Sequence, residues 1–229
     1  MDLSTVVHAV SVWFLPIVVA ITFHEAAHGW VAERCGDDTA RVLGRVSFNP
    51  IKHVDPFGTL LLPAVLLLLK SPILFGYAKP VPVNFWRLRH PKRDMIWVAL
   101  AGPGANVLLA FVAALLLHPA VYLSPQITPW VGENLSNAIY INVILAVFNM
   151  LPVPPLDGGR VLTGLLPPRA AWRFAQLERY GLLILIGLLF LVPLAASSLL
   201  GTEFNPLWDV LQPLVRGLYI LVLTLAGQG

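Results

Sequence analysis

Long apolar runs with few charged residues restrict how this chain can fold more than any other feature. The chain of 229 residues is 57% hydrophobic and only 12% charged, whereas soluble domains carry about 25% charged residues. A soluble core of this size could not bury so much apolar surface. The sequence therefore predicts an all-α polytopic membrane protein with about five spanning helices. The runs that predict these helices are 6–31, 95–117, 139–151, 182–200 and 207–225.

Two further segments predict structure of another kind. Residues 57–69 are apolar but shorter than the roughly 20 residues that span a bilayer, and Pro63 interrupts them. We interpret them as a re-entrant or interfacial sixth segment, with a short tilted span as the alternative. Residues 81–85 read Val-Pro-Val-Asn-Phe, which is typical of extended chain and predicts a small β element near the cytoplasmic side.

The domain organisation follows from these runs. We expect one membrane-embedded domain over 1–229, with a core at 20–160 followed by a basic connector and two helices at 161–229. No Lys or Arg precedes the first apolar run, so we interpret that run as a retained helix rather than a cleaved signal. Cys35 is the only cysteine, which excludes an intrachain disulfide, and a net charge of +3 is too small to indicate nucleic-acid binding.

The distribution of basic residues predicts the orientation in the membrane. Ten of the 15 Lys and Arg residues lie within 34–93 and four lie within 160–179, whereas the loops at 118–138 and 201–206 contain none. Because cytoplasmic loops carry the excess of Lys and Arg, both basic regions should be cytoplasmic. The N-terminus is then outside and the C-terminus inside, provided that 57–69 does not cross. We expect a multi-pass protein of the cell membrane, in particular a bacterial cytoplasmic membrane.

The first apolar run contains the sequence His24-Glu25-Ala26-Ala27-His28. On a helix, side chains four residues apart share one face, so both imidazoles can bind one Zn²⁺ while Glu25 serves as general base. Ionisable groups inside an apolar span are costly and indicate function. The alternative is a helix end at the lipid headgroups, because Arg34 follows closely.

A catalytic zinc site needs a third protein ligand, and Asp157 is the best candidate. It follows an apolar run, and the positive-inside rule places it near the same membrane face as His24 and His28. An ordinary Asp-Gly turn is the alternative interpretation of Asp157. His53 and Asp55 remain as fallback ligands.

Three stretches of the chain, taken together, carry a specific resemblance. His24 to His28 is a metal-binding helix motif, residues 149–158 read NMLPVPPLDG, and residues 101–106 read AGPGAN. In this order and spacing they resemble the site-2 protease family of intramembrane zinc metalloproteases, whose second motif is an Asn followed by prolines and Leu-Asp-Gly. Residues 35–56 and 77–94 also look like a compact bacterial branch of that family.

The resemblance implies an enzyme, a zinc endopeptidase that cleaves transmembrane protein or peptide substrates within the lipid bilayer. It implies that 33–93 contains a membrane-embedded sheet that offers the substrate an edge strand. No PDZ-like or nucleotide-sensing domain is expected. It also implies roles for five residues: zinc ligation by His24, His28 and Asp157, activation of water by Glu25, and a place close to the substrate for Asn149.

A membrane metal transporter that uses the same residues as a transit site is the alternative function. A transport pathway usually places polar groups in several spans. The runs 95–117 and 182–200 contain no ionisable residue, which favours the protease.

Overall fold

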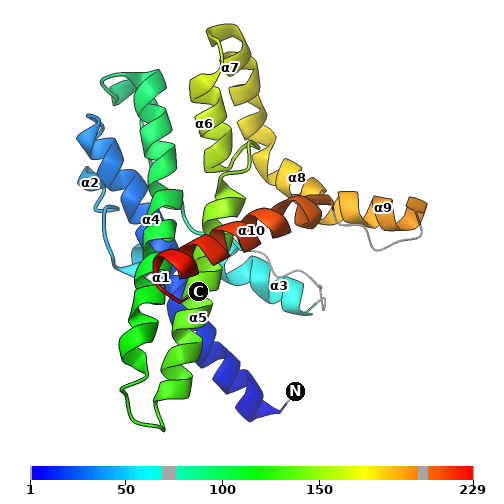
Figure 1. Ribbon diagram of the computed structural model, residues 1–229. Helices are drawn as coiled ribbons and strands as arrows, with labels where there is room; N and C mark the ends of the chain where they lie inside the picture. Colours follow the sequence, from blue (N-terminus) through cyan, green and yellow to red (C-terminus); the bar gives the residue numbers. More distant parts are fainter. Residues whose placement is uncertain (1, 69–75, 201–205, 229) are drawn as a thin grey trace.

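The computed structural model describes residues 2–68, 76–200 and 206–228, and the regular structure within these ranges is helical (Figure 1). The α-helices are α1 (Leu3–Arg34), α2 (Thr39–Val42), α3 (Leu62–Leu68), α4 (Pro91–Ala120), α5 (Thr128–Asn149), α6 (Asp157–Leu165), α7 (Pro168–Ala175), α8 (Gly181–Ile186), α9 (Val192–Leu200) and α10 (Pro206–Leu225). Short 3-10 helices lie at Pro50–His53, Phe85–Arg87 and Gln176–Tyr180, and π-helical turns at Pro56–Leu61 and Gly187–Leu191.

Helices of membrane-spanning length and composition confirm the expected class of fold. Within the described ranges, five helical segments are long and apolar enough to cross a bilayer, in agreement with the predicted number. They are Leu3–Arg34, Pro91–Ala120, Thr128–Asn149, Pro168–Ser198 and Leu207–Leu225. The protein is therefore an all-α, multi-pass membrane protein.

The centre of the molecule is a bundle of α1, α4 and α5, which pack against one another along their lengths (Figure 1). Small side chains let α4 approach α5 closely: Ala110, Ala113 and Ala114 pack against Ile139 and Val143 in one buried cluster. Helix α10 lies across α4 and α5 and extends this cluster. The packed bundle gives the faces of α1 and α4 fixed positions relative to each other.

Helix α5 begins well before the apolar run 139–151 that predicted it. Its first turns carry polar side chains that bond to α1. Glu133 Oε2 lies 2.8 Å from His8 Nε2, and Asn137 Nδ2 donates to the Val12 carbonyl at 3.1 Å. Apolar content alone underestimates the length of this helix, because α1 forms hydrogen bonds with the polar side chains of its first turns.

The predicted β element at 81–85 is wrong, since no strand occurs among the described residues. Pro82 in this segment, like Pro80 just before it, lacks the N–H group that a ladder requires, and side chains accept the N–H groups of two other residues. The Val81 N–H donates to Glu25 Oε2 at 2.8 Å, and the Asn84 N–H donates to Asp37 Oδ2 at 2.6 Å. The expected edge strand for a substrate is likewise not found there.

The sixth apolar segment is short and helical. The π-helical turn at Pro56–Leu61 continues directly into α3, and the Asp55 carboxylate caps the turn by accepting the N–H groups of Phe57 and Gly58. These 13 residues extend about 20 Å as a helix, less than the roughly 30 Å of bilayer hydrocarbon. No candidate span includes them. Residue 69, the end of the predicted segment, lies outside the described residues.

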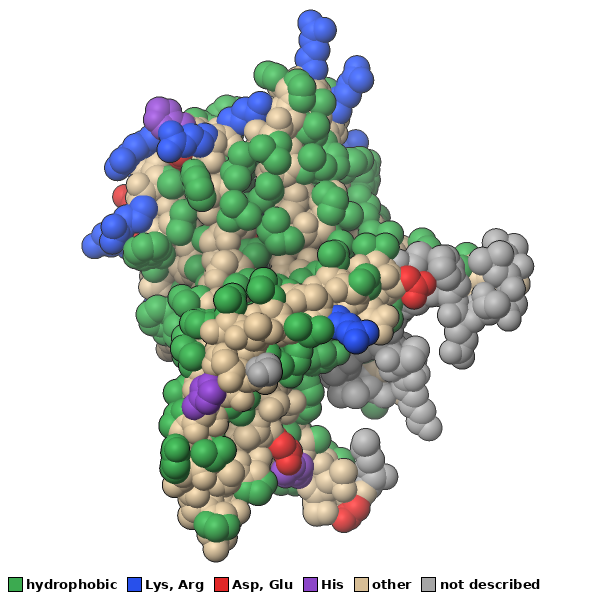
Figure 2. Space-filling model, viewed as in Figure 1, with side chains coloured by type: hydrophobic (Ala, Val, Ile, Leu, Met, Phe, Trp, Pro, Cys, Tyr) green, Lys and Arg blue, Asp and Glu red, His purple; other side chains and the backbone are tan. Residues whose placement is uncertain are grey.

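Basic side chains gather at one end of the bundle. Figure 2 shows most of the visible Lys and Arg side chains at the end formed by α2 and α7. At the other end, residues 121–127 connect α4 to α5 and contain no Lys or Arg. The two ends of α4 therefore differ in charge as the positive-inside rule requires of cytoplasmic and external faces.

Cysteine labelling at the two ends of α4 tests this orientation. Lys92 and Ser124 are both exposed, and each is replaced by Cys in a Cys35→Ser background. Burial raises the pKa of the Cys35 thiol, so the native cysteine is a slow probe. We expect a membrane-impermeant maleimide to label Ser124→Cys but not Lys92→Cys in intact cells, and both after lysis. The reverse pattern would invert the topology.

Candidate metal centre

His24 and His28 lie on the buried face of α1, one helical turn apart. Both side chains are buried and face α4 and the first turn of α6. The spacing of four residues stacks them on the same face, as the sequence predicts. Their ring centroids are 4.7 Å apart, and their Nε2 atoms are 3.0 Å apart.

Asp157 is the first residue of α6, where the chain leaves the irregular loop after α5. The residue after it is a glycine because the first turn of α6 rests directly on that loop. A Cβ atom on Gly158 would lie 2.2 Å from the Met150 carbonyl oxygen and 2.4 Å from that of Leu151. The Asp-Gly sequence thus brings a carboxylate against α1 by a close backbone contact that a larger residue would prevent.

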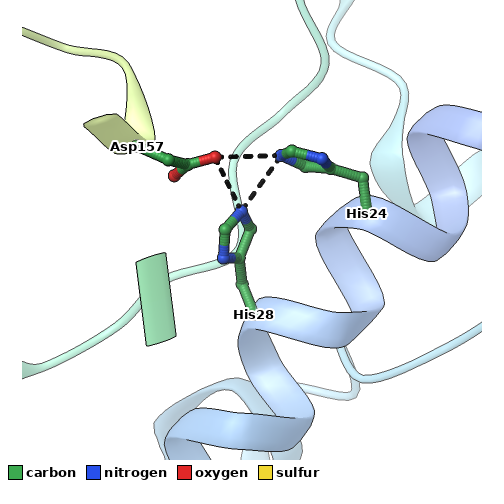
Figure 3. Close-up of side chains that lie close together, drawn as sticks. All are labelled: His24, His28 and Asp157. Carbon is green, nitrogen blue, oxygen red and sulfur yellow. Dashed lines mark hydrogen bonds and ion pairs between the residues drawn. The ribbon is translucent and has the colours of Figure 1, made fainter. Parts of the chain in front are cut away.

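The three side chains converge on one point (Figure 3). Asp157 Oδ2 lies 3.2 Å from His24 Nε2 and 3.3 Å from His28 Nε2. One ligand atom from each residue lies within 4.8 Å of the other two, and all three residues are buried. The structure brings together the three residues that sequence and topology had singled out.

The hydrogen-bond partners of the two Nδ1 atoms determine which nitrogen of each imidazole carries the hydrogen. His24 Nδ1 lies 2.6 Å from Asn106 Oδ1, and His28 Nδ1 lies 2.7 Å from the Val98 carbonyl oxygen. Both partners are acceptors, so each Nδ1 carries the hydrogen and donates it. Each Nε2 then presents a lone pair toward Asp157, which is the arrangement of metal-binding histidines.

These donor atoms fit a zinc ion. Zinc binds imidazole nitrogen at about 2.0–2.1 Å and carboxylate oxygen at about 2.0–2.2 Å in tetrahedral geometry, which places its ligand atoms about 3.3–3.5 Å apart. The observed separations of 3.0, 3.2 and 3.3 Å are close to that value. Asp157 Oδ2 is buried and has no hydrogen-bond donor. A bound cation would stabilise a buried anionic oxygen that faces two neutral imidazole nitrogens.

The wall of the centre opposite α1 is Gly102 of α4. A Cβ atom there would lie 2.4 Å from His28 Nε2 and 2.6 Å from His24 Nε2. Glycine at this position therefore leaves the space that the two imidazoles occupy.

Glu25 and Asn149 lie outside the converging cluster. The half-buried Glu25 carboxylate follows His24 on α1 and accepts the Val81 N–H. Asn149, at the last turn of α5, donates from Nδ2 to the Leu145 carbonyl oxygen at 3.0 Å.

The fallback ligands are not part of the cluster either. Asp55 caps the π-helical turn, and His53 Nε2 lies 2.8 Å from the Ser47 carbonyl oxygen.

The sequence alone assigns no role to Asn106, Val98 or Gly102. Residues 101–106 match a motif, but the motif predicts no function for any of its members. One available signal is that Asn106 is an amide within a run of apolar residues, where an unpaired polar group is costly. The Val98 contact uses the backbone and has no signature in the sequence.

Comparisons with known proteins find related sequences. The model of peptidase family M50 matches residues 12–128 and 121–194. "Putative zinc metalloprotease YwhC" of Bacillus subtilis is 38% identical over 189 residues, which cover 81% of this chain and 82% of that protein. Rip2 of Mycobacterium tuberculosis, which has the same description, is 31% identical over 187 residues, 82% of this chain and 69% of that protein. No solved structure matches significantly.

Alanine at position 102 tests the metal centre. Because its methyl group would overlap both imidazole nitrogens, we expect Gly102→Ala to lose most of its zinc, by at least about tenfold in affinity. Gly104 is the matched control on the same helix, since a Cβ atom there meets nothing within 4 Å. Zinc content of the purified proteins is measured by atomic emission. Equal zinc in the two variants would contradict the position of the centre.

Proposed function

This chain belongs to peptidase family M50, the site-2 protease family, and is a zinc metalloprotease; we propose that it hydrolyses peptide bonds within transmembrane segments of other membrane proteins. The observation that carries the proposal is that His24, His28 and Asp157 are buried between α1 and α4. Both helices have membrane-spanning length and composition. A centre held between spanning helices can reach a peptide bond in a segment that itself enters the bilayer.

The depth of the centre supports the same proposal. His24 lies ten residues before Arg34, the end of α1, which is about 15 Å along the axis. Gly102 lies eleven residues after Pro91, the start of α4, which is about 17 Å. Both of these helix ends are the basic ends. If α1, with its 32 residues and length of about 48 Å, is centred in about 30 Å of hydrocarbon, the centre lies just inside the basic boundary.

We assign zinc ligation to His24, His28 and Asp157. The assignment is supported by the converging lone pairs and by the unpartnered Asp157 oxygen. When bound, zinc supplies Lewis-acid chemistry that polarises a peptide carbonyl and makes water acidic enough to react near neutral pH.

We assign the role of general base to Glu25. Its carboxylate would take a proton from the attacking water and deliver it to the leaving amine. The Val81 N–H, at 2.8 Å from Oε2, orients this carboxylate.

Asn149 is proposed to contact the substrate. Among the described residues, its amide oxygen accepts no hydrogen bond, and its amide nitrogen bonds only to its own helix. The side chain can therefore turn toward a substrate backbone without breaking a tertiary contact. A transmembrane helix must unwind before its carbonyl groups become available, and an amide of this kind can bond to the freed backbone groups.

The proposed location is the cell membrane, with the basic end of the bundle in the cytoplasm. If all five candidate helices cross the bilayer, an external N-terminus implies a cytoplasmic C-terminus. The substrates are proteins or peptides with a transmembrane segment, and the lipid bilayer is the common medium of enzyme and substrate.

Replacement of Glu25 by Gln separates catalysis from metal binding. Gln keeps an oxygen acceptor for the Val81 N–H but cannot take a proton. We expect Glu25→Gln to retain near-normal zinc and to lower cleavage of a single-span substrate in proteoliposomes by at least about 100-fold. Glu33→Gln is the control, since Glu33 lies on the same helix and pairs with Arg41 at its basic end. Unchanged cleavage by Glu25→Gln would refute its role as the base, and loss of zinc would favour a transit site.

The cleavage position tests the depth argument. Since the centre lies near the basic boundary, we expect the scissile bond in the cytoplasmic half of the substrate helix. Mass spectrometry of both products identifies the bond, and substrates with shifted transmembrane registers provide the control. Cleavage in the outer half would show that the centre is deeper than the helix lengths indicate.

A further inference from the structure

A pair of buried amides connects the candidate metal centre to α5. Asn106 of α4 is completely buried, and Asn142 of α5 is 2% exposed. Asn106 Nδ2 donates to Asn142 Oδ1 at 2.7 Å and to the Ala20 carbonyl oxygen at 3.2 Å. Its oxygen faces His24 Nδ1 at 2.6 Å.

The partners of Asn106 permit only one orientation of its amide. Its nitrogen has two acceptors, one on Asn142 and one on the backbone of α1. If the amide were reversed, its oxygen would face the Ala20 carbonyl oxygen and its nitrogen would face His24. The oxygen therefore faces His24, and His24 Nδ1 must donate.

Asn142 is oriented in the same way from its own helix. Its Nδ2 donates to the Ala138 carbonyl oxygen at 2.8 Å, one turn earlier on α5, which leaves Oδ1 for Asn106. A continuous series of donors and acceptors thus runs from the backbone of α5 through both amides to the imidazole of His24. Each member takes its orientation from the member before it.

We infer that Asn106 and Asn142 are positioning residues that fix the tautomer of His24, and thereby keep its Nε2 lone pair available to the metal. Neither residue belongs to the ligand set. The inference rests on the proposed assignment of His24 as a ligand. Asn142, which does not touch His24, acts through Asn106.

Zinc affinity tests the inference in the full-length protein in detergent. The zinc dissociation constant is measured by competition with a chelator. We expect Asn106→Leu to weaken binding about 10–100-fold, the range for losing a partner of a ligand histidine, and Asn142→Leu to weaken it by at least about threefold. Asn106→Asp keeps an acceptor for the His24 Nδ1 hydrogen but loses both donor bonds, to Ala20 and to Asn142, so it should bind zinc more weakly than the wild type but more tightly than Asn106→Leu.

A control and a double variant separate positioning from packing. Asn134 is a buried amide on α5 that donates to the Trp130 carbonyl oxygen, one turn earlier, so Asn134→Leu removes a similar bond away from the centre and should leave zinc affinity unchanged. The combined Asn106→Leu and Asn142→Leu variant should bind no more weakly than Asn106→Leu alone, because Asn142 acts only through Asn106. Additive losses in zinc affinity would show that Asn142 does not act through Asn106.

A second readout measures the tautomer itself. Nitrogen-15 NMR of histidine-labelled, metal-free protein distinguishes a protonated Nδ1 from a protonated Nε2. We expect the His24 signal to change in Asn106→Leu and in Asn142→Leu, but not in Asn134→Leu. If Asn106→Leu does not fold, Asn106→Ser replaces it, since its side chain is too short to reach His24.

Asp157→Ala distinguishes the failure of this inference from the failure of the ligand assignment. If Asp157→Ala retains zinc, the assignment of ligands is wrong. If Asp157→Ala loses zinc while Asn106→Leu and Asn142→Leu bind as the wild type does, only the role of the amides is overturned.

Discussion

Two imidazole nitrogens and one carboxylate oxygen meet in the interior of this protein, and with both imidazoles neutral none of the three has a hydrogen to donate to the others. Each His Nδ1 donates outward, to Asn106 or to the Val98 carbonyl, so the inward atoms are all acceptors. Such a cluster repels itself in a medium that water does not screen. A cation at its centre stabilises it, and the surrounding packing holds the ligands in place to receive that cation.

Close backbone packing helps to hold the ligands in place. Gly102 leaves room for the imidazoles on one side, and Gly158 lets α6 rest on the loop after α5 on the other. In a membrane interior, where apolar side chains gain little by leaving lipid, small residues allow the close contacts that hold helices together. Here the same small residues also set the distance between ligands, so packing and metal geometry depend on the same positions.

The sequence predicted the class of fold and the converging side chains because both depend on strong, local signals. Apolar runs mark spans, and the spacing of His24 and His28 places both on one helical face. Loop charge placed Asp157 at a similar depth. The predicted β element failed because sequence does not reveal that a side chain, Glu25, would take the Val81 N–H in place of a neighbouring strand. The early start of α5 was missed for a related reason, since its polar side chains bond to α1.

These two misses and the unassigned Asn106 have one physical origin. In lipid, a polar group must find a protein partner, so a polar residue inside an apolar segment indicates that a partner exists without saying which one. Three such residues are Asn106, Asn142 and Asn137. Each forms a hydrogen bond to a residue of another helix. Only the packed structure identifies these partners. Because Asn106 is bonded to His24, the network that joins the helices also reaches the candidate metal centre, and helix packing and ligand chemistry are joined at a single amide.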